Sequence, residues 1–280
     1  MIIQTALNEA VTKLKESKIK SPLLDCEILL SRVLKRNREF VILNFNRDLK
    51  KNDYDYFLKL INIRAKGKPI AQIIQKKFFW KNEFEISDNV LIPRPDTELI
   101  VEQVLDISKN KKYLNVLEVG IGSGCVLLSI LKEKKAFLGT GIDISKDCLN
   151  VTKINAYKLG LDNRLKLFKS DVDNFDYGKY DLIISNPPYI KKNLLKYLEK
   201  DVVGFEPKLA LDGGLEGLSE IRKVIKKSSV LIKKNGVLIL EIGFNQKNQI
   251  KMILKKEGFY IDKIVKDLSK NDRCIISRKV

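Results

Sequence analysis

The sequence predicts a doubly wound α/β domain of about seven strands, preceded by a small N-terminal helical bundle and a β-hairpin linker. From about residue 95 onward, short apolar runs alternate with stretches of helical length, as in folds built on a mostly parallel sheet. Before residue 75, apolar residues instead recur at helical spacing, without a strand pattern between them. We therefore expect three parts, at residues 1–75, 76–94 and 95–280.

Three helices are predicted in the first part. The first carries four apolar residues on one face: Ile3, Leu7, Val11 and Leu14. The second begins after Ser21, an N-cap candidate that is followed by a proline at the first helical position. The third covers residues 54–65, with Asn52 or Asp53 as its cap, and stops before Gly67.

The linker has a different pattern. In residues 76–92, aromatic and β-branched residues alternate with polar ones around Lys81-Asn82. This alternation predicts a β-hairpin that connects the two domains, with its turn at those two residues.

Seven apolar runs predict the strands of the α/β domain: 115–120, 136–143, 165–170, 180–186, 236–243, 259–267 and 273–280. Strands this apolar are expected to be buried on both faces of the sheet. The helices predicted between them cover 123–135, 145–160, 217–234 and 245–258.

Composition excludes several kinds of site. The chain has no histidine, which removes Ser-His triads, histidine-based metal sites and the usual general base. Its four cysteines form no CxxC pair, so we expect no metal. No run approaches the roughly 18 apolar residues of a membrane span, and the first residues lack the pattern of a signal peptide. We therefore expect a cytoplasmic protein without a membrane partner. No sequence feature reports on oligomeric state, and our working expectation is a monomer.

The chain is strongly basic. Lys and Arg number 53 against 35 Asp and Glu, which gives a formal net charge of +18. A field of this size attracts acidic partners such as ribosomal RNA, tRNA or an acidic protein. The excess is mostly lysine spread along the chain, so a compositional bias without function explains it equally well.

A glycine-rich turn follows the first predicted strand of the α/β domain. Gly120, Ile121, Gly122, Ser123 and Gly124 lie between that strand and the next helix, where glycines allow a tight turn and close approach to a ligand. The spacing G-x-G-x-G differs from the G-x-G-x-x-G of nicotinamide enzymes. With no pyrophosphate to bind, this tighter turn suits the amino-acid and ribose parts of S-adenosylmethionine.

Two aspartates follow the next two strands. Asp143 lies about 20 residues beyond the glycine turn, where a carboxylate can accept both hydroxyls of a ribose. Its alternative role is the N-cap of the next helix, which Ser145 can also supply. Asp171 is placed beside an adenine in such folds, although a solvated loop aspartate competes with that interpretation.

The most specific motif is Asn186-Pro187-Pro188-Tyr189, at the carboxyl end of a central predicted strand. The prolines stiffen the turn and remove backbone donors, so its carbonyls remain as acceptors. The Asn186 side-chain oxygen and the Pro187 carbonyl can hold the two hydrogens of an NH2 group, and Tyr189 can stack on its plane. Such acceptors build electron density on a poorly nucleophilic planar nitrogen, beside a sulfonium methyl held in line.

These motifs resemble the HemK/PrmC family, whose members methylate the glutamine of the GGQ motif in class I peptide release factors. The resemblance covers VLIPRPDTELIVE (90–102), EVGIGSG (118–124), GIDIS (141–145), NPPYI (186–190), VVGFEPKLALDGGLEGLSEIR (202–222), EIGFNQ (241–246) and DLSKNDR (267–273). It implies a class I S-adenosylmethionine-dependent methyltransferase of Rossmann-like fold, with S-adenosylhomocysteine as product, and an N-terminal helical domain that engages the release factor.

Carried over by position, the resemblance implies cofactor contacts from Gly120, Ile121, Gly122, Ser123, Gly124, Asp143, Asp171, Val172 and Asn186. It implies contacts to the substrate amide from Asn186, Pro187, Pro188 and Tyr189. The chain departs from the family in Glu118, where many relatives have Asp, and in Val172, where some place an aromatic residue. Arg94 and Asp96 either order the loop at the substrate mouth or have structural roles. In the structural alternative, Asp96 or Thr97 caps the next helix and Arg94 forms a pair on the surface.

Two other functions fit parts of the sequence. A nucleic-acid adenine N6-methyltransferase uses a similar proline-rich turn on the same planar NH2 group, and the positive charge suits it. Such an enzyme usually needs a base-flipping pocket and a separate recognition domain, for which only some 75 residues remain. A non-catalytic protein that binds RNA or the ribosome is the third hypothesis, against which the intact Asn186-Pro187-Pro188-Tyr189 turn argues.

Overall fold

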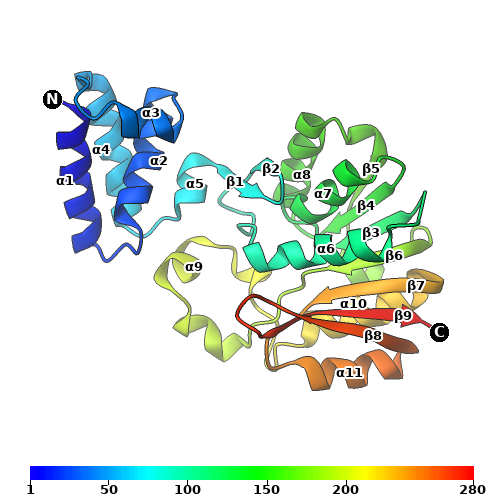
Figure 1. Cartoon of the computed structure of the whole chain (residues 1–280). Coiled ribbons are helices and arrows are strands. Elements are labelled where there is room, and N and C mark those ends of the chain that lie inside the picture. The colour runs from blue at the N-terminus through cyan, green and yellow to red at the C-terminus, as the bar shows by residue number, and fades with distance from the viewer. The chain divides into compact units, whose positions relative to one another are not determined.

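The computed structural model describes residues 1–280, and the chain divides into two compact units (Figure 1). The first unit comprises Met1–Lys76 together with Glu199–Phe205, and the second comprises Lys77–Leu198 and Glu206–Val280. No helix is both long and apolar enough to cross a membrane.

The first unit is a helical bundle. Its helices are α1 (Ile3–Glu16), α2 (Pro22–Leu34), α3 (Arg38–Leu43), α4 (Lys51–Ala65), α5 (Ile70–Ile74) and α9 (Lys200–Phe205). Figure 1 shows α1, α2 and α4 side by side, and their apolar stripes form one core with Leu14, Leu30 and Phe57 fully buried. The predicted cap of α4 was wrong, because the helix starts at Lys51 and its N-cap residue is Lys50.

The short helix α9 joins this unit although it lies more than a hundred residues further along the chain. The Gln72 side chain donates a hydrogen bond to the Phe205 carbonyl at 2.9 Å, and Arg64 approaches Asp201 at 4.0 Å. Nothing in the local sequence pattern predicted this placement.

A buried ion pair lies inside the same unit. Arg64 Nε donates to Asp25 Oδ2 at 2.7 Å, and both side chains are less than a tenth exposed. Arg64 also donates to the Lys68 carbonyl at 3.0 Å, so two of its donors are satisfied. Such a pair is costly to break, because the remaining charge stays buried without a partner.

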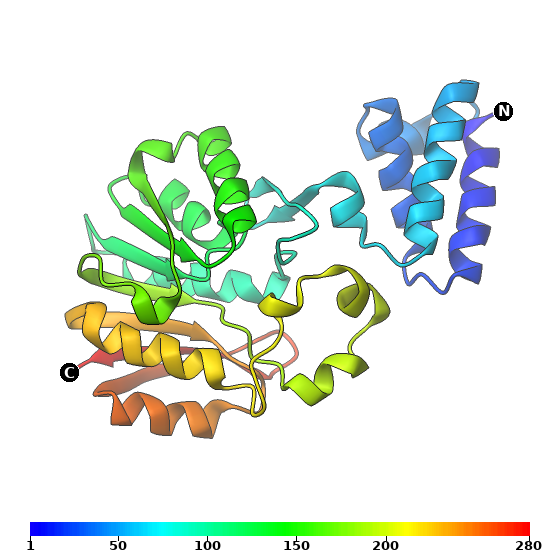
Figure 2. The ribbon, with the colours of Figure 1, turned by 180° about the vertical axis from the view of Figure 1, so that it is seen from behind.

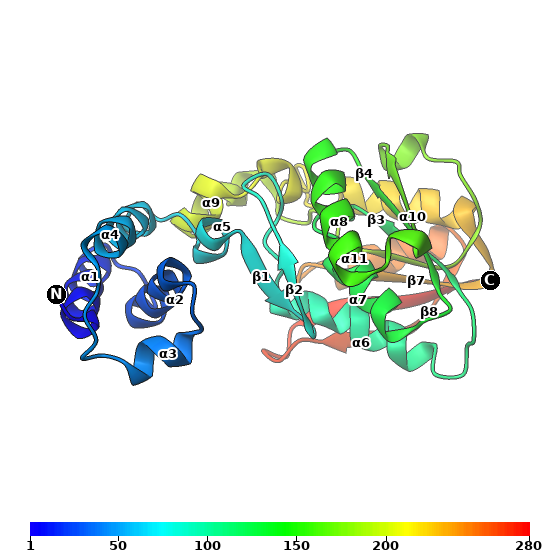
Figure 3. The ribbon, with the colours of Figure 1, turned by 90° about the horizontal axis from the view of Figure 1, so that it is seen from above.

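The linker forms the predicted hairpin from β1 (Lys76–Phe79) and β2 (Asn82–Glu85), which Figure 3 shows from above. The turn lies at Trp80-Lys81, one residue earlier than predicted. Trp80 adopts a left-handed conformation, and its backbone N–H donates to Glu98 at 2.7 Å. This tertiary contact outweighs the local preference of an asparagine for the turn.

Seven strands form the main sheet: β3 (Asn115–Val119), β4 (Leu138–Asp143), β5 (Leu165–Lys169), β6 (Tyr180–Ser185), β7 (Ile232–Glu241), β8 (Phe259–Lys266) and β9 (Asp272–Lys279). Their order is β5-β4-β3-β6-β7-β9-β8, with β9 antiparallel to both of its neighbours. The predicted seven-stranded α/β fold is confirmed. One boundary was wrong, since residues 232–234 extend β7, where Ile232 pairs with Tyr180, rather than the preceding helix.

Helices cover both faces of this sheet. They are α6 (Glu98–Ile107), α7 (Cys125–Glu133), α8 (Lys146–Leu159), α10 (Ser219–Leu231) and α11 (Lys247–Lys256). The first three pack on one face and the last two on the other, so α6 is in front in Figure 1 and α10 in the reverse view of Figure 2. Short 3-10 turns occupy Pro95–Thr97, Asp162–Arg164, Val172–Asn174, Lys192–Tyr197 and Lys208–Ala210.

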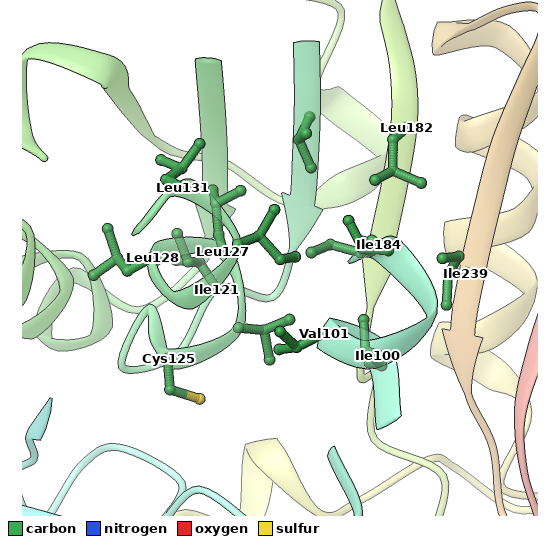
Figure 4. Close-up of a cluster of buried hydrophobic side chains, with 14 of the residues drawn as sticks. Ile100, Val101, Ile121, Cys125, Leu127, Leu128, Leu131, Leu182, Ile184 and Ile239 are labelled. Atoms are coloured by element: carbon green, nitrogen blue, oxygen red, sulfur yellow. The ribbon is translucent and has the colours of Figure 1, made fainter. Parts of the chain in front are cut away.

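Successive strand residues point to opposite faces, which explains why the inner strands β3 and β6 are apolar and buried. The edge strands β5 and β8 instead keep exposed polar residues, so the predicted burial on both faces does not hold for them. In β6, Leu182 and Ile184 share a hydrophobic core with Ile100 and Val101 of α6 (Figure 4). Ile183 belongs to the core on the α10 side. Because both faces are covered, the inner strands are held firmly up to their carboxyl ends.

We predict that Asp25→Ala destabilises the helical unit by about 3 to 5 kcal/mol, since Arg64 then remains buried without its carboxylate. Native-state hydrogen exchange at the amides of α2 and α4 measures the change. Lys20→Ala is the matched control, because it removes an exposed pair with Glu199 in the same unit and should leave exchange unchanged. Equal exchange in the two variants would contradict the prediction.

Candidate active site

A cavity of about 530 Å³ opens at the carboxyl edge of the parallel strands. It lies within the second unit, and its volume falls in the roughly 300 to 1,000 Å³ range of small-ligand pockets. The chain runs from β3 outward to β4 and β5 and then returns to β6 on the other side of β3. Ligands of open α/β sheets bind at such a switch in strand order.

The glycine turn after β3 forms one wall of this cavity. Four of its residues line the cavity: Gly120, Ile121, Gly122 and Ser123. The φ angles of Gly120, Gly122 and Gly124 are positive, at 73°, 56° and 80°. A Cβ atom at Gly120 or Gly122 would meet no atom within 4 Å, so there is open space beside the turn.

Gly124, the fifth predicted residue of the turn, does not line the cavity. A Cβ atom there would lie 2.8 Å from Thr152 Cγ2 of α8. This glycine therefore allows α7 and α8 to pack closely, which is a structural role.

Asp143 ends β4 and faces the same cavity. Its two oxygens accept backbone N–H bonds from Gly122 at 3.0 Å and from Ser145 at 2.9 Å. Burial nevertheless raises the pKa of this carboxyl. Ser145, rather than Asp143, is the N-cap of α8, where it accepts from the Cys148 N–H. The Asp143 carboxylate thus faces the cavity while backbone donors hold its two oxygens.

Asp171 and Val172 follow β5 and also line the cavity. The Asp171 side chain caps a short 3-10 turn by accepting from the Asp173 N–H at 2.9 Å. Val172 is 7% exposed and belongs to the core on the α10 side of the sheet. Strand order therefore brings Asp171, Asp143, the glycine turn and Asn186 into one row along the edge.

Glu118 lies under the glycine turn and lines the floor of the cavity. It is 4% exposed and accepts the Leu127 N–H of α7 at 3.0 Å. Burial raises the pKa of this carboxyl well above its ordinary range, and the nearby Asp143 adds to the shift.

The proline-rich turn after β6 forms the opposite wall. Asn186, Pro187 and Pro188 line the cavity, but Tyr189 does not. The Tyr189 hydroxyl donates to Glu241 Oε1 at 3.2 Å, and its ring packs against the core on the α10 side. The expected stacking of Tyr189 over a substrate amide therefore has no counterpart in this arrangement of the side chain.

A chain of hydrogen bonds joins Asn186 to Thr97 and Glu241. The Asn186 Nδ2 group donates to Thr97 Oγ1 at 3.1 Å, and Thr97 donates to Glu241 Oε2 at 2.7 Å. Glu241, at the end of β7, is 2% exposed, and burial raises its pKa. Its second oxygen accepts from Tyr189.

Contacts to backbone carbonyls also hold the proline-rich turn. Gln246 Nε2 donates to the carbonyls of Tyr189 at 3.0 Å and of Gly217 at 2.8 Å. A Cβ atom at Gly213 would lie 2.9 Å from the Pro188 carbonyl oxygen, and one at Gly217 would lie 2.5 Å from that of Tyr189. Both positions therefore need glycine.

Arg94 also lines the cavity and pairs with Glu206 at 2.5 Å. The Glu206 side chain is 1% exposed and also accepts from the Ile92 N–H at 3.3 Å. The sequence left Arg94 as either a loop-ordering residue or a surface partner. Its buried partner shows that it ties residues 92–94 to the segment that begins at residue 206.

Comparisons with known proteins decide the family. The PrmC N-terminal domain matches residues 5–74, and the methyltransferase small domain matches residues 95–202. Release factor glutamine methyltransferases of Clostridium acetobutylicum and Clostridium botulinum are 38% and 37% identical over 99% and 100% of this chain, and over 98% and 100% of their own lengths. The chain belongs to the release factor glutamine methyltransferase family. A solved ribosomal protein L11 methylase of Lactobacillus delbrueckii shares the fold, with a TM-score of 0.52 and 19% identity over 73% of this chain and 90% of that one.

Sequence reasoning missed several residues of this methyltransferase site. Thr97, Glu241 and Gln246 lie in segments that resembled the family, but no local pattern indicated that they support Asn186 and Tyr189. The only sequence signal for these three residues was the resemblance of residues 90–102 and 241–246 to the family. Their convergence depends on strand order, which is a tertiary property.

We predict that Gly124→Ala destabilises the methyltransferase unit more than Gly160→Ala does. Both glycines are left-handed, which costs an alanine about 1 to 2 kcal/mol, but only Gly124 faces a neighbour, Thr152, whereas Gly160 has none within 4 Å. Urea unfolding of the two variants measures the difference. Equal losses of unfolding free energy would show that the contact with Thr152 is unimportant.

We predict that Glu118→Gln stabilises the unit relative to wild type increasingly as pH rises. Because the pKa of Glu118 is higher in the folded than in the unfolded chain, the folded state binds more protons between the two pKa values. The contribution of Glu118 to the free energy of unfolding of the wild type is therefore fully present below about pH 4.5. It is lost as pH rises, by at most about 1.4 kcal/mol per pH unit. The amide removes this dependence.

Urea unfolding at pH 5 and pH 7.5 without ligand tests the Glu118 prediction. The difference in unfolding free energy between the variant and wild type should grow toward pH 7.5. A difference that is the same at both pH values would mean that Glu118 titrates normally in the folded chain.

Proposed function

We propose that this chain transfers the methyl group of S-adenosylmethionine to the side-chain amide nitrogen (N5) of the glutamine in the GGQ motif of class I peptide release factors. The product would be S-adenosylhomocysteine, and the modification would modulate translation termination. One observation carries the proposal: the Asn186-Pro187-Pro188 turn lines the same cavity as the glycine turn and Asp143, in a chain that matches the family over its whole length.

The residues of the cavity fit the cofactor. Open space beside Gly120 and Gly122 admits an amino-acid group, and Asp143 offers acceptor lone pairs for ribose hydroxyls. Asp171 and Val172 would bound the adenine, with the valine supplying an apolar surface. When bound, S-adenosylmethionine supplies an electrophilic sulfonium methyl group.

The turn after β6 would hold the acceptor. An amide nitrogen is a poor nucleophile because its lone pair is delocalised into the carbonyl group. The Asn186 side-chain oxygen and the Pro187 carbonyl would accept its two hydrogens, which favours a pyramidal nitrogen and stabilises the positive charge that develops. Orientation by this rigid turn would supply much of the remaining rate enhancement.

We further propose that the helical unit, residues 1–75 in the predicted division, recognises the release factor. This unit also includes Glu199–Phe205. These residues follow the proline-rich turn at residues 186–189, here called the acceptor turn, by only about ten residues along the chain. The net charge of +18 would favour an acidic protein surface or a weak contact with nucleic acid. We expect the enzyme to act as a monomer.

A methyl-transfer assay with labelled S-adenosylmethionine tests the proposal. The acceptors are a purified class I release factor, its GGQ-to-GGA variant and unmethylated DNA. Label on the glutamine form alone is the expected result. Label on DNA and on neither protein would instead establish the adenine methyltransferase.

We predict that Asn186→Ala lowers kcat toward the release factor by roughly 100- to 1,000-fold, because one of the two acceptors for the amide is lost. Asn150→Ala is the matched control, since Asn150 is an exposed asparagine on α8 outside the cavity. Single-turnover assays measure both variants. An Asn186→Ala enzyme within threefold of wild type would contradict the role given to this residue.

A further inference from the structure

The two ends of the Asn186 side-chain amide have opposite hydrogen-bonding character. The oxygen end accepts and the nitrogen end donates, so only one orientation can hold the hydrogens of an acceptor NH2 group. With the nitrogen end toward the cavity, two donors would face each other. Something must therefore determine which end points inward.

Thr97 contacts the nitrogen end of this amide and, like Asn186, lines the cavity. Its hydroxyl has a single proton, which it donates to Glu241 Oε2 at 2.7 Å. Its oxygen can then only accept, and it accepts from Asn186 Nδ2 at 3.1 Å. If the amide were reversed, Asn186 Oδ1 would meet the lone pairs of Thr97 Oγ1, a contact with no proton between two acceptors.

Glu241 keeps the Thr97 proton pointed away from Asn186. Its two oxygens are divided between Thr97 and the Tyr189 hydroxyl, and the side chain is almost completely buried. Arg273 compensates its charge: the guanidinium lies 3.5 Å from the Tyr189 oxygen and donates to the Ile242 carbonyl at 3.3 Å. Arg273 also pairs with Asp267 at 3.0 Å and with Asp96 at 3.5 Å, so two further carboxylates share its positive charge.

We propose that Thr97 and Glu241 are positioning residues that fix the polarity of the Asn186 amide, so that its oxygen faces the cavity. The inference rests on the proposed function, in which that oxygen binds the acceptor nitrogen. It extends that function by assigning the orientation of one amide to residues from two other elements. These are the 3-10 turn that contains Thr97 and the end of β7 that contains Glu241. Thr97 lines the cavity and Glu241 lies outside it, and both would act on the acceptor through Asn186.

Polarity can be observed without any acceptor. Neutron diffraction from deuterated wild-type crystals locates the deuterons on the Asn186 amide and on the Thr97 hydroxyl. We expect two deuterons on the end that faces Thr97, and the Thr97 deuteron directed at Glu241. Deuterons on the cavity end of Asn186 would overturn the inference, whatever the enzyme methylates.

Kinetics of three threonine variants then show whether the polarity matters. Thr97→Val keeps the shape of the side chain but removes the hydroxyl, and we expect kcat to fall at least about tenfold, while KM for the release factor and affinity for S-adenosylhomocysteine stay within twofold. Thr97→Ser restores the hydroxyl and should recover kcat to within threefold. Thr140→Val, a buried change on β4 outside the cavity, is the matched control and should leave all three constants unchanged.

The outcomes separate the two proposals. A wild-type enzyme that does not methylate the glutamine would overturn the proposed function, and the neutron result would still decide the polarity. An active wild type with a Thr97→Val enzyme of normal kcat would overturn the positioning role alone. Equal losses in Thr97→Val and Thr97→Ser would do the same, because the hydroxyl would then not be what matters.

Discussion

The common carboxyl edge of the parallel strands is the constraint on which the site depends. Because β5, β4, β3 and β6 are neighbours and run in the same direction, the residues that follow them emerge in one row. That row contains Asp171, Asp143, the glycine turn and Asn186. Helices on both faces bury β4, β3 and β6, so the ends of these strands are held by two hydrophobic cores rather than by loops.

Buried polar groups add precision that apolar packing cannot supply. Hydrophobic contacts are non-directional, whereas each hydrogen bond specifies a donor and an acceptor. Glu241 links Thr97 of the 3-10 turn before α6, Tyr189 of the acceptor turn and its own strand β7. Such a network is costly unless every member is satisfied, and here its members satisfy one another at the point where an acceptor amide would need a fixed orientation.

The segment after the acceptor turn links both units of the enzyme through the chain itself. Residues 199–205 belong to the helical unit, and Glu206 returns at once to the methyltransferase unit to bind Arg94. The recognition role proposed for the helical unit and the acceptor role proposed for Asn186 therefore involve parts that are close in sequence. A release factor held by the helical unit would engage a region with a direct covalent connection to the acceptor turn.

The sequence by itself determined the seven strands, the glycine turn and the proline-rich turn, because apolar periodicity, glycine and proline act over a few residues. It also placed Asp143 and Asn186 correctly at strand ends, while Gly124 and Tyr189 proved to lie outside the cavity. Only the tertiary structure decided that α9 joins the helical unit and that Thr97, Asn186 and Glu241 form one network. These contacts join residues 89 and 144 positions apart, and no local preference encodes which distant side chain will satisfy a buried hydrogen bond.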